Sequence, residues 1–272
     1  MKQIIIATDY SKAAVNATRY GVEMAQAINA GILLFHVYQM PVGYSEVPLS
    51  INLSELQEAA ESGIMRLKNE LTQQTAGKLP IETEARMGTF SQELERICED
   101  RKPYAVVMGS QGTSAAERLL LGSHTVHAMK HLHTPVIAVP PGVSYSGIKK
   151  IGLACDFEEV VDTTPVEEIR TLIGDFRAQL HVLNTGSKGD YNPEVVYQSG
   201  LLQEMLGPLK PEYHFIDNKD IDEGIVEFCD RNAVDLLVVL PKRHSLLDKL
   251  VHRSHTRRLV LHSHTPVMSL HE

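Results

Sequence analysis

The chain has 272 residues, of which 43% are hydrophobic and 22% charged, and its formal net charge is −8 at pH 7. This length leaves room for two globular domains, each with its own core. The negative charge argues against non-specific nucleic-acid binding, which needs a basic surface. No apolar run is long enough to cross a membrane, and the N-terminal segment becomes acidic too early for a secretion signal. We therefore expect a cytoplasmic protein.

The first half of the chain alternates between two hydrophobic patterns. Short apolar runs rich in β-branched residues predict strands at 3–8, 32–37, 104–108 and 135–139, and a further strand is expected at 80–86. Amphipathic patterns of helical period predict helices at 11–30, 54–76, 91–100 and 122–133, with Ser11, Ser54 and Ser91 near their N-termini as caps. Residues 38–53 contain two prolines and a glycine, and we expect an irregular insertion there.

The second half repeats this order. Strands are expected at 150–155, 179–184, 211–216, 235–239 and 266–270, and helices near 164–177, 192–207, 220–231 and 253–263. Strict alternation of strand and helix predicts an α/β fold with a doubly wound parallel sheet. In such sheets, ligands bind beyond the carboxyl ends of the strands, where the strand order reverses.

Three segments of the first half have similar or identical counterparts in the second half, in the same order along the chain. The pairs are KQIIIATDY at 2–10 with KKIGLACDF at 149–157, SHT at 123–125 with SHT at 254–256, and HTPV at 133–136 with HTPV at 264–267. Such internal repetition indicates two copies of one unit. We predict domains at 1–141 and 148–272, each with a five-stranded parallel sheet, joined by a linker at 142–147.

The cysteines fit the expected compartment. Cys98, Cys155 and Cys229 are widely spaced, odd in number, and each lies in an apolar pattern. We expect reduced thiols in the core of a cytoplasmic protein.

One glycine-rich segment of the first unit carries the strongest functional signal. Gly109 and Gly112 follow the strand at 104–108 and allow a tight turn that exposes backbone N–H groups. Gly122 and Ser123 open the next helix, whose N-terminus favours an anion. The combination predicts a phosphate site. The alternative is an ordinary strand-to-helix connection in which the glycines serve only the turn.

The spacing Gly-x2-Gly-x9-Gly-Ser, followed by the strand TPVIAVP at 134–140, resembles the nucleotide-binding pattern of the universal stress protein family. Asp9, at the end of the first strand, matches the acidic residue of that family. The resemblance covers the whole chain and implies a tandem, Rossmann-like member with the adenine nucleotide alpha-hydrolase-like fold. It implies a stress-response protein that binds ATP, or AMP or ADP in its place, and changes its associations. Whether Mg²⁺ accompanies the nucleotide is left open.

The resemblance also implies which residues bind the nucleotide. They are Asp9, Val37, Gly109, Gly112, Arg118, Gly122, Ser123 and Thr125. Asp9 would accept a hydrogen bond from the ribose or adenine, and Val37 would contact the base. The glycine N–H groups and the two hydroxyls would hold phosphates, with Arg118 neutralising one. Simpler roles are a helix cap for Asp9, core packing for Val37 and a solvated charge for Arg118.

The second unit departs from this pattern. Leu240, Arg243 and Arg253 stand where the first unit has its three glycines, although Asp156 and Ser254 are kept. Side chains at these positions would fill the space where backbone approaches phosphate. We predict a scaffold copy without the nucleotide site. The alternative is an anion site built from the two arginine side chains.

No metal or hydrolytic motif accompanies the histidines. His124, His127 and His131 share a helix face, and His252, His255, His262 and His264 cluster in the second unit, without Cys-x-x-Cys or His-Glu-x-x-His. We interpret them as half-exposed helix residues and predict no metal site. Gly-x-Ser-x-Gly and the Gly-x4-Gly-Lys phosphate loop are absent too, so catalysis would be at most slow ATP hydrolysis.

Two other classes of function stay open at this point. One is a scaffold that binds no nucleotide, and the other is a slow ATPase. The predicted last strands, 135–139 and 266–270, are candidates for edge-to-edge pairing within the chain or in a homodimer, because an exposed edge strand offers unpaired backbone groups. No nucleic-acid or membrane partner is expected.

Overall fold

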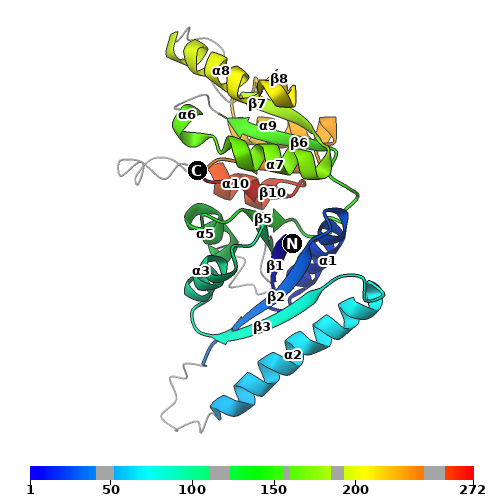
Figure 1. The fold of residues 1–272 in the computed structure, drawn as a ribbon. Coiled ribbons are helices and arrows are strands. Elements are labelled where there is room, and N and C mark those ends of the chain that lie inside the picture. The colour runs from blue at the N-terminus through cyan, green and yellow to red at the C-terminus, as the bar shows by residue number, and fades with distance from the viewer. Residues whose placement is uncertain (41–51, 111–122, 156–159, 185–192, 242–254) are drawn as a thin grey trace, which may run out of the picture.

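A single sheet of ten strands runs through the protein (Figure 1). The computed structural model describes residues 1–40, 52–110, 123–155, 160–184, 193–241 and 255–272. The strands are β1 Gln3–Ala7, β2 Gly31–Tyr38, β3 Ile81–Met87, β4 Ala105–Gly109, β5 Val136–Val139, β6 Lys150–Cys155, β7 Gln179–Asn184, β8 Glu212–Phe215, β9 Leu236–Val239 and β10 Val267–Ser269. Their order is β3-β2-β1-β4-β5-β10-β9-β6-β7-β8.

Nine α-helices and a 3-10 turn are described alongside these strands. They are α1 Lys12–Ala27, α2 Leu53–Gln74, α3 Phe90–Arg101, α5 Ser123–His131, α6 Val160–Thr163, α7 Val166–Phe176, α8 Pro193–Leu206, η1 Gly207–Leu209, α9 Ile221–Asn232 and α10 His255–His262. None of the helices in the described ranges is long and apolar enough to span a membrane. The α/β class predicted from the sequence is confirmed.

The strand order is the same in the two halves, read outward from the centre. Within each half all described strand pairs are parallel, whereas β5 and β10 pair antiparallel, with Ile137 opposite Met268. The two five-stranded parallel sheets expected from the sequence are present, and they join through these two strands into one continuous sheet. These two short apolar strands would each have left an unpaired edge on its own half.

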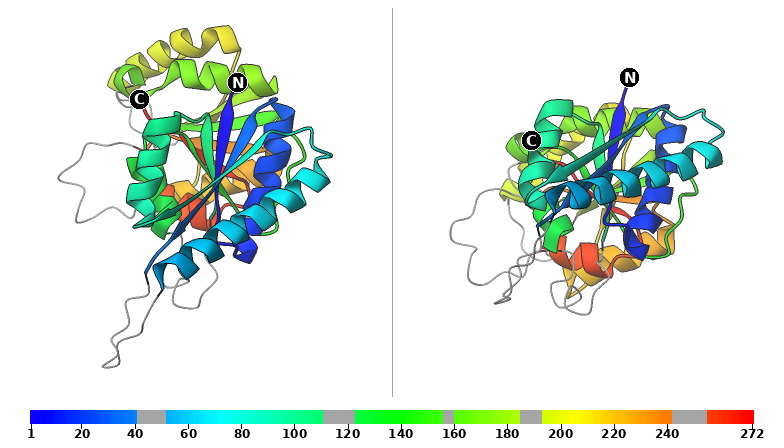
Figure 2. Two further views of the ribbon diagram at one scale, coloured as in Figure 1. Left: turned by 60° about the horizontal axis from the view of Figure 1, so that its bottom comes forward. Right: turned by 90° about the horizontal axis from the view of Figure 1, so that it is seen from below.

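Helices cover both faces of the sheet (Figure 2). Buried side chains of α1, α2, α7 and α8 pack on one face, and those of α3, α5, α9 and α10 pack on the other. Strand residues alternate between the two cores, so Ile4 and Ile6 belong to the first and Ile5 to the second. A strand buried on both faces reads as a continuous apolar run, which explains the sequence pattern.

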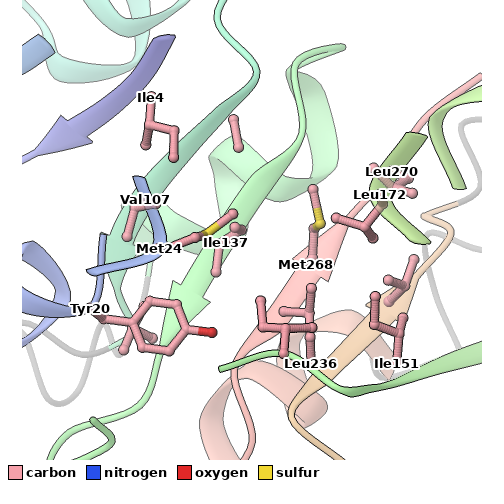
Figure 3. Packing of buried hydrophobic residues seen from close by; sticks show 14 of the residues in the cluster. Ile4, Tyr20, Met24, Val107, Ile137, Ile151, Leu172, Leu236, Met268 and Leu270 are labelled. Carbon is pink, nitrogen blue, oxygen red and sulfur yellow. The ribbon is translucent and has the colours of Figure 1, made fainter. Parts of the chain in front are cut away.

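The first of these cores is shared by the two halves. Figure 3 shows Ile137 of β5 beside Met268 of β10, with Met24 on one side and Leu236 on the other. All four side chains are at most 2% exposed. The halves are therefore held together by apolar packing as well as by strand pairing.

The linker region lies against the first half. The side-chain amide of Asn16 donates to the carbonyls of Pro140 and Val143, each at 3.1 Å. The ring of Tyr145 meets that of Tyr20 edge-on, with centroids 5.3 Å apart. Residues between β5 and β6 are thus anchored on α1.

Several helix starts differ from expectation. Ser11 caps α1 as predicted, but Asn52 caps α2 in place of Ser54, and Thr89 precedes α3 in place of Ser91. The helix expected near 164–177 is α7, with Pro165 as its N-cap residue, and a short additional helix, α6, precedes it. Proline lacks an N–H group and disfavours helical geometry in the residue before it, so α6 and α7 do not join.

The three cysteines are free and buried, as the sequence predicted. Burial raises the pKa of the Cys98 thiol to about 11 and that of Cys229 to about 12. Both are therefore protonated at neutral pH, and a protonated thiol is a poor nucleophile.

The shared core leads to a prediction about cooperativity. Met268→Ala should lower the free energy of unfolding by about 2–5 kcal/mol, because it leaves a cavity between the halves. Urea unfolding, followed by circular dichroism and tyrosine fluorescence, should give one transition that moves as a whole. Met65→Ala on α2, where the side chain is 45% exposed, is the control and should change little. Two separate transitions, of which only one moves, would contradict a shared core.

Candidate functional site

The strand order of the first half reverses between β1 and β4. From β1 the sheet continues through β2 and β3 on one side, and through β4 and β5 on the other. Asp9 follows the carboxyl end of β1, and Gly109 is the last residue of β4. Since β1 and β4 are paired neighbours, with Ile6 opposite Val107, the structure brings both predicted residues to one edge of the sheet. This is the position at which doubly wound sheets bind ligands.

Asp9 keeps an exposed carboxylate at this edge. Its Oδ1 accepts a hydrogen bond from the backbone N–H of Ser11 at 3.0 Å. Ser11, and not Asp9, caps α1, because its hydroxyl accepts from the N–H of Ala14 at 3.0 Å. The simple role of helix cap is thus already filled by another residue. Asp9 fixes the turn before the helix and leaves carboxylate oxygen facing solvent.

Gly109 is required by close packing. A Cβ built at this position would lie 3.0 Å from both the carbonyl carbon and the oxygen of Ala13. The first turn of α1 therefore rests directly on the end of β4. The φ angle of Gly109 is not positive, so the left-handed conformation that glycine tolerates is not used at this residue. Its function in the fold is to let backbone approach backbone.

Thr125 connects the start of α5 to the same point. Its buried hydroxyl lies 2.9 Å from the carbonyl oxygen of Gly109, and since a carbonyl only accepts, the hydroxyl donates. Its single proton is therefore engaged, which leaves no donor for a phosphate while this bond persists. The bond holds the N-terminus of α5 against the end of β4. Next to it, the hydroxyl of Ser110 is buried and has no hydrogen-bond partner in the described part of the chain.

Val37 is half-buried on β2 and packs against the core on the side of α3 and α5. Two residues that the sequence analysis did not select lie at the same end of β2 but on its opposite face, because neighbouring strand residues alternate between faces. The rings of Tyr10 and His36 have centroids 4.7 Å apart, and His36 Nδ1 donates to the carbonyl of Thr8 at 2.8 Å. Tyr10 has a φ of 63°, a strained value for a tyrosine. Burial raises the pKa of its hydroxyl, with Arg66 acting in the opposite direction.

Part of the predicted set lies outside the described residues: Gly112, Arg118, Gly122 and the side chain of Ser123. In the second half the same holds for Asp156, Arg243, Arg253 and Ser254. The structure thus brings Asp9, Gly109 and Thr125 together around the junction of β1, β4 and α5. Val37 lies on the neighbouring strand.

The second half is built differently at the corresponding place. Leu240, the counterpart of Gly109, follows β9, is half-buried and packs against the first core. In both halves a helix begins soon after the first strand, α1 at Lys12 after Ala7 and α6 at Val160 after Cys155. The observed difference is therefore the residue after the fourth strand: Leu240 adds a side chain to the core where Gly109 has none.

Comparison with known proteins identifies the family. The family model of the universal stress protein family matches residues 1–140 and again 147–271. The chain belongs to the universal stress protein family. With two matches in one chain, it is a tandem member. The resemblance stated from the glycine spacing and Asp9 is confirmed at the level of the family.

Sequence identity between this chain and individual relatives is low. The chain is 29% identical to the universal stress protein MJ0531 of Methanocaldococcus jannaschii over 140 residues, which are 51% of this chain and 81% of that protein. It is 27% identical to MJ0577 of the same organism over 153 residues, 51% of this chain and 94% of the other. A universal stress protein from Archaeoglobus fulgidus has a similar crystal structure, with a TM-score of 0.74 at 18% identity, covering 99% of this chain and 96% of that one.

A pair of glycine substitutions tests the packing at the site. Gly109→Ala should lower the free energy of unfolding by about 1–3 kcal/mol, because the new methyl group meets the backbone of Ala13. Gly174→Ala is the control. No atom lies within 4 Å of a Cβ at Gly174, which is exposed on α7, so this change should raise stability by up to about 1 kcal/mol. Equal urea midpoints for Gly109→Ala and the unchanged protein would show that α1 moves aside without cost.

Proposed function

We propose that this universal stress protein binds an adenine nucleotide, ATP or AMP or ADP in its place, in its N-terminal unit. The observation that carries the proposal is the convergence of three features at one sheet edge. An exposed carboxylate follows β1, a glycine whose backbone lies close to that of α1 ends β4, and the N-terminus of α5 is held beside it. The proposed binding residues are Asp9, Val37, Gly109, Gly112, Arg118, Gly122, Ser123 and Thr125.

The described residues fit such a ligand. The carboxylate of Asp9 would accept a hydrogen bond from a ribose hydroxyl or the adenine amino group. Val37 offers an apolar side chain for the flat base on the face that α3 and α5 cover. The first N–H groups of α5 are free of helical partners and attract a phosphate. Thr125 would act as a positioning residue, because its hydroxyl holds this helix end on Gly109.

We further propose that the bound nucleotide controls association in a stress response, and is not a substrate. A tandem arrangement with domains at 1–141 and 148–272, and a linker at 142–147, would place one nucleotide site and one scaffold copy in each chain. The pairing of β5 with β10 supports an arrangement in which the two units associate within the chain. Three free, buried thiols fit a reducing compartment such as the cytoplasm.

The second unit is proposed to bind no nucleotide. Leu240 supports this, because its side chain stands where the first unit needs bare backbone. The competing proposal is an anion site made by Arg243 and Arg253. Two alternatives to the proposed function also need to be tested. One is a scaffold that binds no nucleotide, and the other is a slow ATPase in the first unit.

The nucleotide content of the protein is the most direct measurement. Freshly purified protein, denatured and analysed by ion-exchange chromatography, should release about one adenine nucleotide per chain. About two per chain would show that the second unit binds as well. If none is found even after incubation with excess ATP, the nucleotide proposal fails and the scaffold is favoured.

Two variants test the residues. Asp9→Asn should weaken ATP binding about tenfold, the loss of one charge-assisted hydrogen bond, and Gly112→Arg should abolish it. Gly174→Arg adds the same charge at an exposed helix position and is the control. Calorimetric titration with ATP measures all three, and circular dichroism checks their folds. Unchanged affinity in both site variants would rule out this location. Phosphate release that disappears with Gly112→Arg would instead support the ATPase.

A further inference from the structure

A histidine pair and a glutamate lie together in the second half, far along the sheet from the candidate nucleotide site. His181 is on β7, and Glu212 and His214 are on β8, the edge strand. His181 is directly opposite Glu212 in the strand register, and His214 is opposite Leu183. All three side chains therefore point to the same face, which α9 covers: Phe228 of that helix packs against His214 with ring centroids 4.7 Å apart.

The potential ligand atoms are close enough to share one ion. His181 Nδ1 lies 3.0 Å from His214 Nε2 and 3.5 Å from Glu212 Oε2, and His214 Nε2 lies 3.8 Å from the same oxygen. Around a tetrahedral zinc ion with bonds of 2.0–2.1 Å, ligand atoms are about 3.3–3.4 Å apart. The three observed distances bracket this value. Small side-chain adjustments would equalise them around a central ion.

We propose that His181, Glu212 and His214 form a binding site for a divalent transition-metal ion, of which Zn²⁺ is the best match. Two imidazole nitrogens and one carboxylate oxygen are a common ligand set for zinc. The fourth position would be taken by water, because the Glu212 side chain is 58% exposed and leaves the site open on one side. The site is independent of the proposed nucleotide function.

The local electrostatics keep His181 in the form that binds metal. Burial lowers the pKa of His181, and His214 and Lys150 act in the same direction, whereas Glu212 acts in the opposite one. His181 is therefore neutral at physiological pH, which is the form that binds metal. The Lys150 ammonium is engaged with the carbonyl of Asn232 at 2.8 Å. Glu212 supplies the negative charge that offsets this lysine.

A histidine–histidine hydrogen bond is the alternative explanation of the 3.0 Å contact. In that arrangement one ring donates to the other, and Glu212 adds only an exposed, weak interaction. The two explanations differ in what Glu212 contributes. Loss of its charge should greatly weaken metal binding, but it should hardly affect a neutral hydrogen-bonded pair.

The test uses the untagged full chain, stripped with EDTA and dialysed. Titration with CoCl₂ should produce the strong visible absorption of tetrahedral cobalt and saturate at one ion per chain, and ZnCl₂ should remove it. Glu212→Gln and His214→Gln should each weaken Zn²⁺ binding at least about tenfold in calorimetric titration. Mutation of residues that only hydrogen-bond to a metal ligand already lowers metal affinity about 10–100-fold, and loss of a ligand should cost at least as much. Zn²⁺ should raise the thermal midpoint of the unchanged protein and have little effect on either variant.

His264→Gln is the matched control. His264 also faces a carboxylate, that of Asp230 at 3.1 Å, but it is 79% exposed and has no second histidine in its described ion pair. This variant should bind Zn²⁺ as the unchanged protein does. Glu212→Gln alters an exposed side chain and decides the question even if His214→Gln fails to fold. Absence of the cobalt spectrum, or equal Zn²⁺ affinity in Glu212→Gln and the unchanged protein, would overturn the proposal.

Discussion

The antiparallel pairing of β5 with β10 is the constraint on which the rest of the structure depends. Because all other described strand pairs are parallel, every strand of one half runs opposite to every strand of the other. The carboxyl ends of the two sets of strands therefore lie at opposite edges of the sheet. The candidate nucleotide site and its counterpart in the second half cannot share a ligand, and each half had to keep or lose its site alone.

The two halves have kept the core and changed the site. Buried strand residues alternate between the two cores in both, whereas Gly109 in one half corresponds to Leu240 in the other. In the first half α1 lies close against the end of β4, so that a Cβ at Gly109 would be 3.0 Å from backbone atoms of Ala13. In the second half the side chain of Leu240 packs against the core.

The sequence predicted what depends on local pattern. Apolar runs located most of the ten described strands, and the alternation of strand and helix patterns located the others, β3 and β8. Internal repetition located the two halves, because short segments return in the same order. Contacts set by strand register could not be predicted in this way. His181 and His214 are separated by a whole helix in the sequence, and their meeting depends on which residues of β7 and β8 are opposite each other. Similarly, the left-handed backbone of Tyr10 is imposed by the turn after β1, so the sequence analysis selected Asp9 but missed the aromatic residue beside it.

The two edge strands of the sheet, β3 and β8, carry different charged groups. An edge strand has unpaired backbone groups, and charged side chains discourage other chains from pairing with it. On β3, Arg86 contacts Glu84, and it also reaches Glu93 and Asp100 on α3. Both the positive and the negative charges of these ion pairs come from the protein itself. On β8 the corresponding charge is that of Glu212, whose described partners are two histidines that are neutral when they bind metal. A bound cation would supply the positive charge that Arg86 supplies at the other edge, and would join the short strand β8 to β7.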